Sequence, residues 1–405
     1  MKMSRWYHWV EKKTSKLLLI SLLSLGLAVA VPMLVSGVLI PTVNAQESLT
    51  STNSQVKMSV VARNLNNPRG LAFKSDGALY ITEAGINEQG IEIPGPAPGV
   101  ILDFGSHGSV TRLYQGVQER IITDLPSITV ETRGTQLTPS VNGSSQTFGV
   151  SDIAFDRKGD AYIVLGYATN PIYRSNLGEA GANLPSLLKI NLTPKGKVVS
   201  IKKIADFAQY ESQANPSNDD LVSDPCSLLI QGNDTLVVDG GANDLLRVNQ
   251  KGDISTEAVF NPRYFPNIDF PVQSVPTAIT LGLDGAYYVG EFSGFPFLEN
   301  VARIFRLKRG QAPQVYAEGF TQIIDIATAP DGGLYVLEYA FHSLLSGDPT
   351  GILIHLSPSG QRKTLVSDGL VFPTAMTIGT DGAIYVSNYG SYAGIGQVVK
   401  IKIVS

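Results

Sequence analysis

The stretch PTAITLGLDGAYYVGE, which begins at Pro276, decides the fold of this chain. It reads as a short apolar strand, a tight Asp-Gly turn and a second apolar strand, and five other segments repeat the pattern. They are PRGLAFKSDGALYITE from Pro68, VSDIAFDRKGDAYIVL from Val150, PCSLLIQGNDTLVVDG from Pro225, IIDIATAPDGGLYVLE from Ile323 and PTAMTIGTDGAIYVSN from Pro373. Strand-only repeats at a spacing of roughly 40–50 residues are typical of a β-propeller, because each small sheet needs neighbours to cover its faces.

Each copy is followed by outer segments in which apolar and polar residues alternate, as in a strand with one buried face. The last copy has only one such segment, QVVKIKIV from Gln397, while VKMSVVARNL from Val56 precedes the first copy. We therefore predict an all-β, six-bladed β-propeller over residues 57–405. Pairing of an N-terminal strand at about residues 57–65 with the C-terminal blade would close the ring and remove an open edge.

The N-terminus has the composition of a targeting segment. Five basic residues precede a 24-residue apolar run from Leu17 to Ile40. Val43-Asn44-Ala45 then resembles the small-residue motif at which signal peptides are cleaved. Residues 1–45 are thus predicted to be a signal peptide and residues 46–56 a short linker. The run is long enough to span a bilayer, so an uncleaved membrane anchor is the alternative. Either way the basic end stays in the cytoplasm and the repeats are exported to the periplasm or beyond the cell.

Charge and cysteine content narrow the range of partners. Without residues 1–45 the chain has 26 basic and 34 acidic residues, a net charge of −8. An acidic exported domain is a poor match for nucleic acid or anionic lipid. Its one cysteine, Cys226, forms no internal disulfide and is expected to be a small buried side chain. We expect a monomer.

The connections differ between the two rims of the predicted ring. Turns within the repeated phrase are tight, whereas long connections all fall on the opposite rim, at residues 86–107, 128–147, 166–185, 208–223, 261–274, 292–300 and 339–350. Loops on a rigid scaffold are where binding usually resides. We therefore expect a small molecule or a protein partner on this loop-rich face.

Acidic residues recur where the repeated strands reach that face. Taken in chain order, the second strands of the six copies end in Glu83, Leu165, Gly240, Glu291, Glu338 and Asn388. Near the start of the first strand, the second copy carries Asp152 and the fifth carries Asp325. A ring of Glu83, Asp152, Glu291, Asp325 and Glu338 would offer the oxygen ligands that Ca²⁺ prefers, with Asn388 beside them. The alternatives are a water-filled channel mouth whose carboxylates bond to backbone amides, and carboxylates that act as catalytic acid and base.

Aromatic residues crowd the same loops, among them Phe292, Phe295 and Phe297, together with Tyr264 and Tyr339. They predict either a pocket for an apolar small molecule, with Phe295 as a ligand contact, or anchors that fix long loops to the rim. No nucleophile elbow, zinc-protease motif, P-loop or cysteine cluster is present in the sequence. The sequence therefore identifies no catalytic residue.

The repeats resemble NHL-type, TolB-like six-bladed propellers, and the chain from about residue 58 onward resembles the ScyD/ScyE family. The matching stretches include NPRGLAFKSDGALYITEAG, DGGANDLLRVN, VPTAITLGLDGAYYVGEFSGFPF and DGAIYVSNYG. The resemblance implies an exported protein linked to the handling of a scytonemin-type or other secreted metabolite. It brings no catalytic residue set.

Three classes of function follow. The first is a binding or accessory module whose loop-rich face holds a small molecule or a partner. The alternative is a Ca²⁺-dependent hydrolase or lactonase that uses the channel-mouth carboxylates. A redox or pigment-processing enzyme is a third class, suggested by the resemblance alone. The residues favour the first class and leave enzymatic activity open.

Overall fold

The computed structural model describes residues 56–86, 90–95, 100–132 and 146–403, and nearly all of their regular structure is β. The described helical segments are short: α2 (Phe207–Ala214) and the 3-10 segments η2 (Pro171–Leu177) and η3 (Leu344–Ser346). Within these ranges no helix has the length and apolar character needed to cross a bilayer. The predicted signal peptide, residues 1–45, lies outside the described residues.

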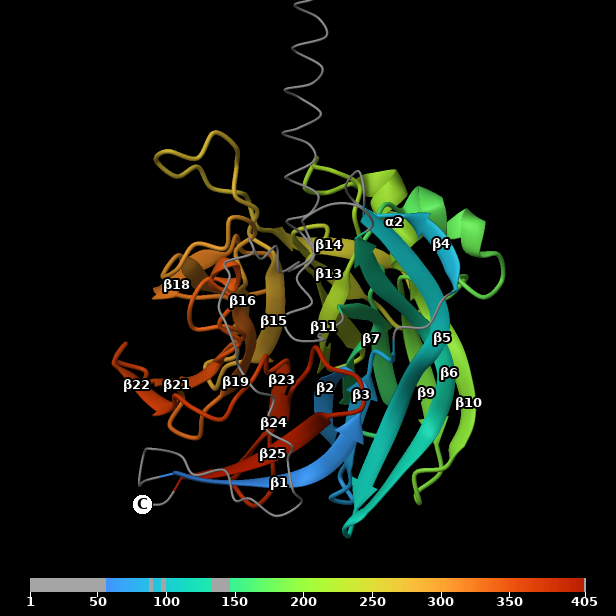
Figure 1. Ribbon diagram of the computed structural model, residues 1–405, viewed down its shortest axis with the longest axis horizontal. Coiled ribbons are helices and arrows are strands. Elements are labelled where there is room, and N and C mark those ends of the chain that lie inside the picture. The colour runs from blue at the N-terminus through green and yellow to red at the C-terminus, as the bar shows by residue number, and fades with distance from the viewer. Residues whose placement is uncertain (1–55, 87–89, 96–99, 133–145, 404–405) are drawn as a thin grey trace, which may run out of the picture.

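Three repeats form separate four-stranded antiparallel sheets whose strands follow one another along the chain (Figure 1). They consist of β11 (Pro225–Gln231), β12 (Asp234–Asp239), β13 (Asp244–Val248) and β14 (Ile254–Val259); of β15 (Pro276–Leu281), β16 (Tyr287–Glu291), β17 (Ala302–Leu307) and β18 (Gln314–Phe320); and of β19 (Ile323–Thr328), β20 (Leu334–Glu338), β21 (Ile352–Leu356) and β22 (Arg362–Val366). In each sheet the first two strands are the two halves of the repeated phrase.

The last repeat completes its sheet with the N-terminal strand. Its order is β1-β25-β24-β23, formed by β1 (Val56–Leu65), β25 (Gly396–Ile403), β24 (Ile384–Asn388) and β23 (Ala375–Ile378). β1 runs antiparallel to β25, with Val56 opposite Ile403 and Val60 opposite Val399. The first and last described strands thus share one sheet.

The first two repeats are joined in one nine-stranded sheet. One group of four is β2 (Pro68–Phe73), β3 (Leu79–Glu83), β5 (Val100–Tyr114) and β6 (Val117–Thr132), and the other is β7 (Thr147–Phe155), β8 (Ala161–Leu165), β9 (Ser186–Leu192) and β10 (Val198–Asp206). The groups meet where residues 127–129 of β6 pair with residues 147–149 of β7. The short β4 (Ile91–Pro94) adds to the outer part of β5.

This extended ribbon corrects one expectation. The sequence predicts long loops at residues 86–107 and 128–147, but β4, β5 and β6 extend into both ranges. The physical reason is the alternation in VILDFGS, residues 100–106. Val100, Leu102 and Phe104 are buried apolar side chains, whereas Ile101 between them is only partly buried and Asp103 is polar. A long antiparallel ribbon buries one such face without breaking its hydrogen bonds.

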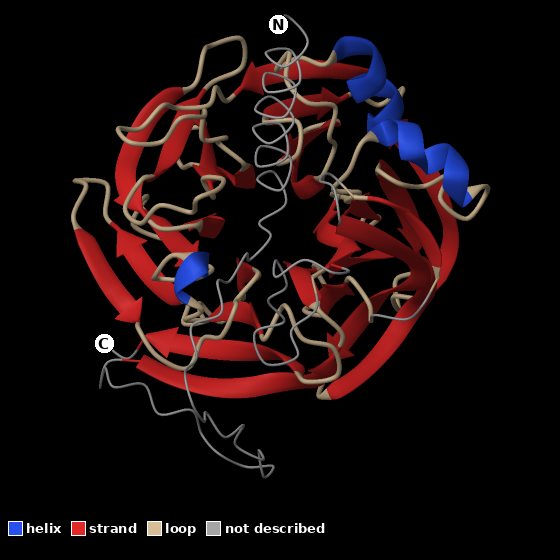
Figure 2. Cartoon of the chain, turned by 45° about the horizontal axis from the view of Figure 1, so that its top comes forward, coloured by secondary structure: helices blue, strands red, loops and turns tan. Residues whose placement is uncertain are grey.

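The innermost strands contact one another in a cyclic order: β2, β7, β11, β15, β19, β23 and again β2. Figure 2 shows the sheets around a common centre. The hydroxyls of Thr374 and Ser387 donate to the carbonyls of Pro68 and Arg69, at 2.6 and 2.7 Å, and so link the last repeat to the first. The inner strands therefore surround a central channel whose walls come from every repeat.

Apolar side chains fill the wedges between neighbouring sheets. One cluster, for example, packs Leu236 and Val238 of one repeat against Ile279, Val289 and Phe305 of the next, and all five are nearly inaccessible to solvent. Similar clusters lie between the other adjacent repeats. Each fully buried side chain of this size stabilises the fold by about 1.5–3 kcal/mol, so the core is distributed around the ring.

Candidate ligand-binding cavity

A β-bulge recurs near the start of the inner strands. In the pairs of β2 with β3, β7 with β8, β11 with β12, β15 with β16 and β19 with β20, the register shifts by one or more residues at the same point. A bulge re-aims the side chain of the extra residue. The residues at this position are Arg69, Ser151, Cys226, Thr277 and Ile324, with Thr374 at the corresponding place in the last repeat.

All six of these side chains line a single cavity at the mouth of the central channel, with a volume of about 120 Å³. Other lining residues come from the ends of the loops and from the next residue along each inner strand. They include Gly70, Asp152, Asp224, Ser227, Phe292, Asp325, Tyr339, Ala375 and Ser391. We call this space the loop-face cavity.

Polar groups of the bulge ring mostly bond to the neighbouring repeat. Thr277 Oγ1 donates to the carbonyl of Ile323 at 2.6 Å, and Thr374 Oγ1 does the same to Pro68. The thiol of Cys226 faces the carbonyls of Pro276 and Thr277 at 3.4 and 3.6 Å. These groups hold the sheets in register and have little capacity left for a ligand.

Arg69 is different, because it carries the ring's one charge and has unused donors. One of its terminal nitrogens donates to the carbonyl of Thr147 at 2.8 Å. Within the described residues no carboxylate lies at ion-pair distance from this guanidinium. None of its nitrogens is both buried and without a hydrogen-bond partner. Burial lowers the pKa of Arg69, with Tyr339 and Asp224 opposing the shift. A guanidinium stays protonated in proteins, so it brings a permanent positive charge into the cavity.

Two predicted site residues, Asp152 and Asp325, also face the cavity. Asp152 accepts hydrogen bonds from the backbone amide of Leu228 at 2.9 Å and from Ser227. Asp325 accepts from the backbone amide of Met376 at 2.6 Å. Each carboxyl thus joins its inner strand to that of the following repeat, as the backbone-amide alternative expects. Both also line a second cavity of about 300 Å³ further along the channel, so they stand between the two spaces.

Burial controls the protonation of these groups. It raises the pKa of Asp152 to about 6, against the hydrogen bonds that favour its charged form. Burial, together with the nearby charge of Asp152, raises the pKa of Asp325 to about 8. Burial and the charge of Asp239 raise the pKa of Asp224 to about 8 as well. Near neutral pH Asp224 and Asp325 are therefore largely protonated and can donate a hydrogen bond, whereas Asp152 is largely ionised.

The opposite wall is aromatic. Phe292 and Tyr339 line the cavity, and their rings lie 5.8 Å apart. Behind them Phe297 and Phe372 are almost fully buried, and Phe372 stacks on Tyr339 with ring centres 4.8 Å apart. The aromatic residues thus serve both roles that the sequence left open, since some anchor loops and two form a wall.

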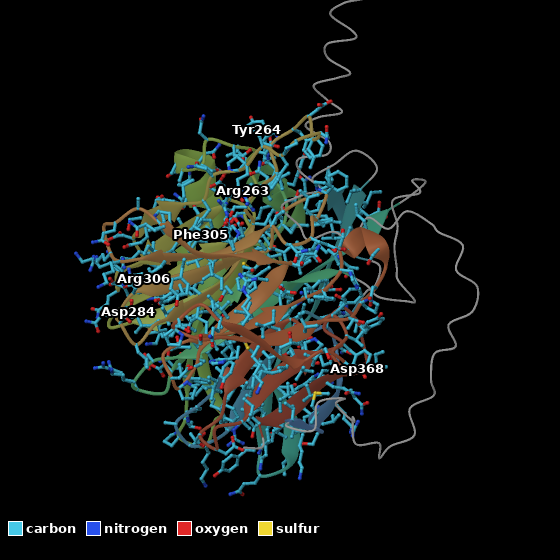
Figure 3. All side chains as sticks on the ribbon, turned by 90° about the vertical axis from the view of Figure 1, so that its left-hand side faces the viewer. Arg263, Tyr264, Asp284, Phe305, Arg306 and Asp368 are labelled. Carbon is cyan, nitrogen blue, oxygen red and sulfur yellow. The ribbon has the colours of Figure 1, made fainter. Side chains whose placement is uncertain are left out.

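Two of the predicted aromatic contacts lie elsewhere. Phe295 is not among the cavity-lining side chains and instead stacks on Phe270, with ring centres 5.9 Å apart. Its ring joins the buried loop cluster behind the aromatic wall. Tyr264 is 77% exposed, at an outer edge of the molecule (Figure 3). Neither ring is among the residues that line the cavity.

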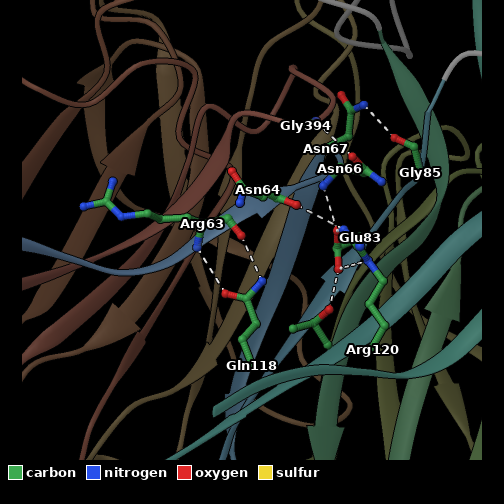
Figure 4. A network of polar contacts seen from close by, with 10 residues as sticks. Arg63, Asn64, Asn66, Asn67, Glu83, Gly85, Gln118, Arg120 and Gly394 are labelled. Carbon is green, nitrogen blue, oxygen red and sulfur yellow. Dashed lines mark hydrogen bonds and ion pairs between the residues drawn. The ribbon is translucent and has the colours of Figure 1, made fainter. Parts of the chain in front are cut away.

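Glu83 and Glu291 are fully buried but are held by partners within their own repeat. Glu83 accepts from both Nε and a terminal nitrogen of Arg120, and from the backbone amide of Asn66 at 2.7 Å (Figure 4). Glu291 accepts from Arg303 at 2.7 Å and from Arg263 at 2.8 Å. These carboxylates tie the end of one strand to the chain that enters the repeat.

Glu338 and Asn388 repeat this arrangement without an arginine at contact distance. Glu338 accepts from the backbone amide of Thr321 at 2.8 Å, and Asn388 from that of Val371 at 2.6 Å. Burial raises the pKa of Glu338 to about 8. The equivalent residue in the third repeat is Asp239, opposite Pro225, and not Gly240 as the sequence alignment had it.

The structure does not bring the five predicted metal ligands together. Among the described residues, no group of three or more His, Cys, Asp or Glu side chains is arranged to hold a metal ion. Two of the five carboxylates already neutralise arginines, a third, Glu338, bonds within its own repeat, and only Asp152 and Asp325 reach the cavity. The residues present therefore do not fit a Ca²⁺ ion at the channel mouth.

Sequence reasoning missed Arg69, Asp224 and the bulge ring. The aligned repeats contained the signal: reading the column one position before Asp152 and Asp325 gives Arg69, Ser151, Cys226, Thr277, Ile324 and Thr374. If side chains alternated strictly along each strand, the residues at this position would point to the opposite face of the sheet from Asp152 and Asp325. The recurring bulge, which the sequence does not announce, turns it into the channel.

Comparisons with solved structures identify the fold. A PQQ-bound aldose sugar dehydrogenase from Streptomyces coelicolor matches at 9% identity and a TM-score of 0.51, covering 86% of this chain and 99% of that one. A Bacteroides thetaiotaomicron protein of unknown function matches at 8% identity and a TM-score of 0.52, covering 86% and 76%. A streptogramin B lyase matches at 14% identity and a TM-score of 0.45, covering 86% and 98%.

The fold is a β-propeller. Identities this low show the architecture and carry no activity over to this chain. No protein-family model and no curated protein sequence matches it. Function must therefore be argued from the loop-face cavity itself.

Proposed function

We propose that this chain is an exported binding module of the ScyD/ScyE type: a six-bladed propeller closed by the pairing of β1 with β25. In this proposal the loop-face cavity holds a small organic anion with an apolar, aromatic body, and the protein acts as a monomer outside the cytoplasm. Support for closure comes from the β1–β25 register and from the cyclic contacts of the inner strands. Support for the family comes from the residues of the resemblance, and support for export from the N-terminal segment.

The observation that carries the binding proposal is Arg69. A permanent cation lines a partly open cavity, without an ion-pair partner in the described part of the chain and with donors free. Leaving a part-buried cation unpaired costs stability, because a charge removed from water is favourable only when it is compensated. A carboxylate or phenolate would compensate it, and guanidinium geometry favours two parallel hydrogen bonds to a carboxylate.

The remaining walls define the rest of the ligand. Phe292 and Tyr339 offer flat apolar surfaces for a ring, and protonated Asp224 or Asp325 offers a hydroxyl to an acceptor. The volume of about 120 Å³ is below the roughly 300–1,000 Å³ of sites for drug-sized ligands. The ligand is therefore small, of the size of a substituted aromatic acid.

The Ca²⁺-dependent hydrolase is the less favoured function. It needs carboxylates that are free to bind a cation at the channel mouth, and Glu83 and Glu291 are engaged by arginines. The cavity also has no activated nucleophile, since burial raises the pKa of Cys226 well above its ordinary value. Binding without turnover is the simpler account of these groups.

Calorimetric titration of the purified full chain tests the proposal. The probes are benzoate, 4-hydroxyphenylacetate and indole-3-acetate, each compared with its neutral amide. We expect at least one acid to bind and its amide to bind at least about tenfold more weakly, because a hydrogen bond to a charged group is worth about 1.5–3 kcal/mol.

Two variants and a control sharpen this titration. Arg69→Met should abolish the preference for the acid, and Arg69→Lys should recover only part of it, because an ammonium lacks the planar fork. Arg157→Met, at an exposed arginine, should behave like the unmodified protein. Equal affinity for acid and amide, or an acid preference that survives Arg69→Met, would refute the proposal.

A further inference from the structure

The loop-face cavity has a charged side and an aromatic side. Arg69 of β2, Asp152 of β7 and Asp224, just before β11, line it from the first three repeats. Phe292 and Tyr339 line it from the loops that follow β16 and β20, in the fourth and fifth repeats. The inner strands contact one another in this same order around the channel. A ligand in the cavity therefore meets charged groups on one side and aromatic rings on the other.

Asp152 lies beside the strand that carries Arg69. A Cβ added to Gly70 would lie 2.3 Å from Asp152 Oδ1, so the residue that follows Arg69 packs directly against this carboxyl. The partners of the carboxyl are neutral: Oδ1 accepts from the backbone amide of Ile153 at 2.8 Å, and Oδ2 from that of Leu228 at 2.9 Å. No cation of the described residues forms an ion pair with it. A carboxylate and a guanidinium thus lie on neighbouring strands, and neither is paired.

Asp224 is the second acid on the charged side. The residue is 8% exposed, and its Oδ1 has no hydrogen-bond partner among the described residues. A Cβ added to Gly166 would lie 2.2 Å from this oxygen and 3.1 Å from Ser151 Oγ, which places the Asp224 carboxyl beside the bulge ring. Such an oxygen is unusual, since buried polar groups are nearly always bonded. A ligand that donates a hydrogen bond to Asp224 would supply the missing partner.

A simple carboxylate would compensate only part of the charged side. It would pair with Arg69 but add a negative charge near Asp152, which is largely ionised near neutral pH because its pKa is about 6. An ammonium on the same ligand would compensate Asp152, and its three donors could also reach Asp224. That ammonium would favour the ionised form of Asp224, because a nearby opposite charge lowers the pKa of a carboxyl. The charged side therefore matches a ligand that carries both charges.

We propose that the loop-face cavity selects an aromatic α-amino acid. Its carboxylate pairs with Arg69, and its ammonium lies at Asp152 and Asp224. Its ring packs against Phe292 and Tyr339, whose faces suit a flat apolar group. An α-amino acid fits this division because both charged groups and the side chain leave one carbon atom, so the charges lie together and the ring points away from them. This inference rests on the proposed function and names the ligand class of the same site.

Calorimetric titration of the unmodified full chain with three matched compounds, near neutral pH, tests the inference. L-Phenylalanine carries both charges, 3-phenylpropionate lacks the ammonium, and 2-phenylethylamine lacks the carboxylate. Phenylalanine should bind at least about tenfold more tightly than either of the others, because each charge-assisted hydrogen bond is worth about that factor. Equal or tighter binding of 3-phenylpropionate would overturn the inference and leave the proposed function standing. If neither carboxylate binds, the inference fails, and the acid and amide titrations above decide the proposed function separately.

Variants of the two acids separate the ammonium contact from the carboxylate contact. Asp152→Asn and Asp224→Asn should each reduce the preference for phenylalanine over 3-phenylpropionate, and the double variant should bring it close to one. Arg69→Met should instead weaken the binding of both compounds. Asp368→Asn, at an exposed acid on another part of the molecule, is the matched control and should change neither affinity (Figure 3). A preference for phenylalanine that survives in the double variant would overturn the inference, and the three-compound comparison decides it even if that variant does not fold.

Discussion

Two sets of carboxyls on the inner strands, which belong to different repeats, have opposite environments. Glu83 and Glu291, at the ends of β3 and β16, are each held by at least one arginine. Asp152 and Asp325, near the starts of β7 and β19, have backbone amides and no cation as partners. The first set is compensated inside the protein, whereas the second faces the cavity.

The difference separates structural from functional polarity. A carboxylate that is paired with an arginine fixes the chain that enters a repeat, and its charge is not available to a ligand. The cavity, by contrast, combines uncompensated acids with the uncompensated Arg69. A group whose pKa is shifted and that lines a cavity is a stronger candidate for a functional residue than an acidic residue without these features.

The largest effect is expected when a compensated carboxylate is removed. Glu291→Ala leaves Arg263 and Arg303 without their shared partner, and it should lower the free energy of unfolding by about 3–5 kcal/mol. Urea denaturation followed by fluorescence measures this change. Asp284→Ala breaks the exposed pair with Arg306 and should change the unfolding midpoint little (Figure 3). Similar losses in both variants would erase the distinction.

A smaller effect, with a defined pH dependence, is expected at Asp325. Its folded-state pKa of about 8 lies above the ordinary value of 3.8, so the folded state binds the proton more tightly. Stability from this group is therefore fully present below pH 3.8 and is lost as pH rises toward 8. Between pH 5 and pH 7 the loss should be about 2–3 kcal/mol.

Asp325→Asn should flatten that slope. The variant should also be less stable at pH 5, because asparagine has one acceptor oxygen for the two backbone amides, of Ile326 and Met376, that Asp325 binds. Urea denaturation of both proteins at several pH values checks the slope, with Glu92→Gln as a control at an exposed carboxyl. An unchanged slope would show that Asp325 is ionised in the folded protein.

Removal of the unpaired cation should stabilise the protein. Arg69→Met replaces a part-buried charge by an apolar side chain, and it should raise the free energy of unfolding by about 1 kcal/mol while it abolishes acid binding. The same unfolding assay, without added ligand, measures it. A clear loss of stability would mean that Arg69 is a structural group like Arg303.

The smallest effect is expected at the thiol. Burial raises the pKa of Cys226, so Ellman's reagent should label it far more slowly in the folded chain than in 6 M guanidinium. Absorbance at the thiolate product band follows the reaction. Rapid labelling of the folded chain would show that the bulge ring opens more readily than the hydrogen bonds to Pro276 and Thr277 indicate.

The repeated phrase was sufficient to predict the strands, because alternation and turn residues act locally. It also indicated that residues 56–65 and the last strand would pair, since one repeat lacked a partner that the other end of the chain supplied. The ribbon of β5 and β6 was missed, because a strand that crosses the rim reads like a loop when the turn residues Gly105 and Gly108 interrupt its pattern.

The direction of side chains was the part that the sequence could not supply. Glu291 and Asp325 were both expected at the channel mouth, but Arg263 and Arg303 bind the first, and a bulge at residue 324 leaves the second at the channel. The one-residue misplacement of Asp239 as Gly240 has the same origin, because only the pairing with Pro225 reveals the register. Arg69 was not predicted as a site residue, because strand alternation alone points its side chain to the face of the sheet opposite that of Asp152 and Asp325.

The most direct test of the cavity is a crystal structure of the full chain with the tightest-binding aromatic acid. Our account predicts the carboxylate at about 3 Å from two nitrogens of Arg69, with the ring against Phe292 and Tyr339. An acid bound outside the cavity, or Arg69 turned away from the ligand into an ion pair with Asp224, would contradict it.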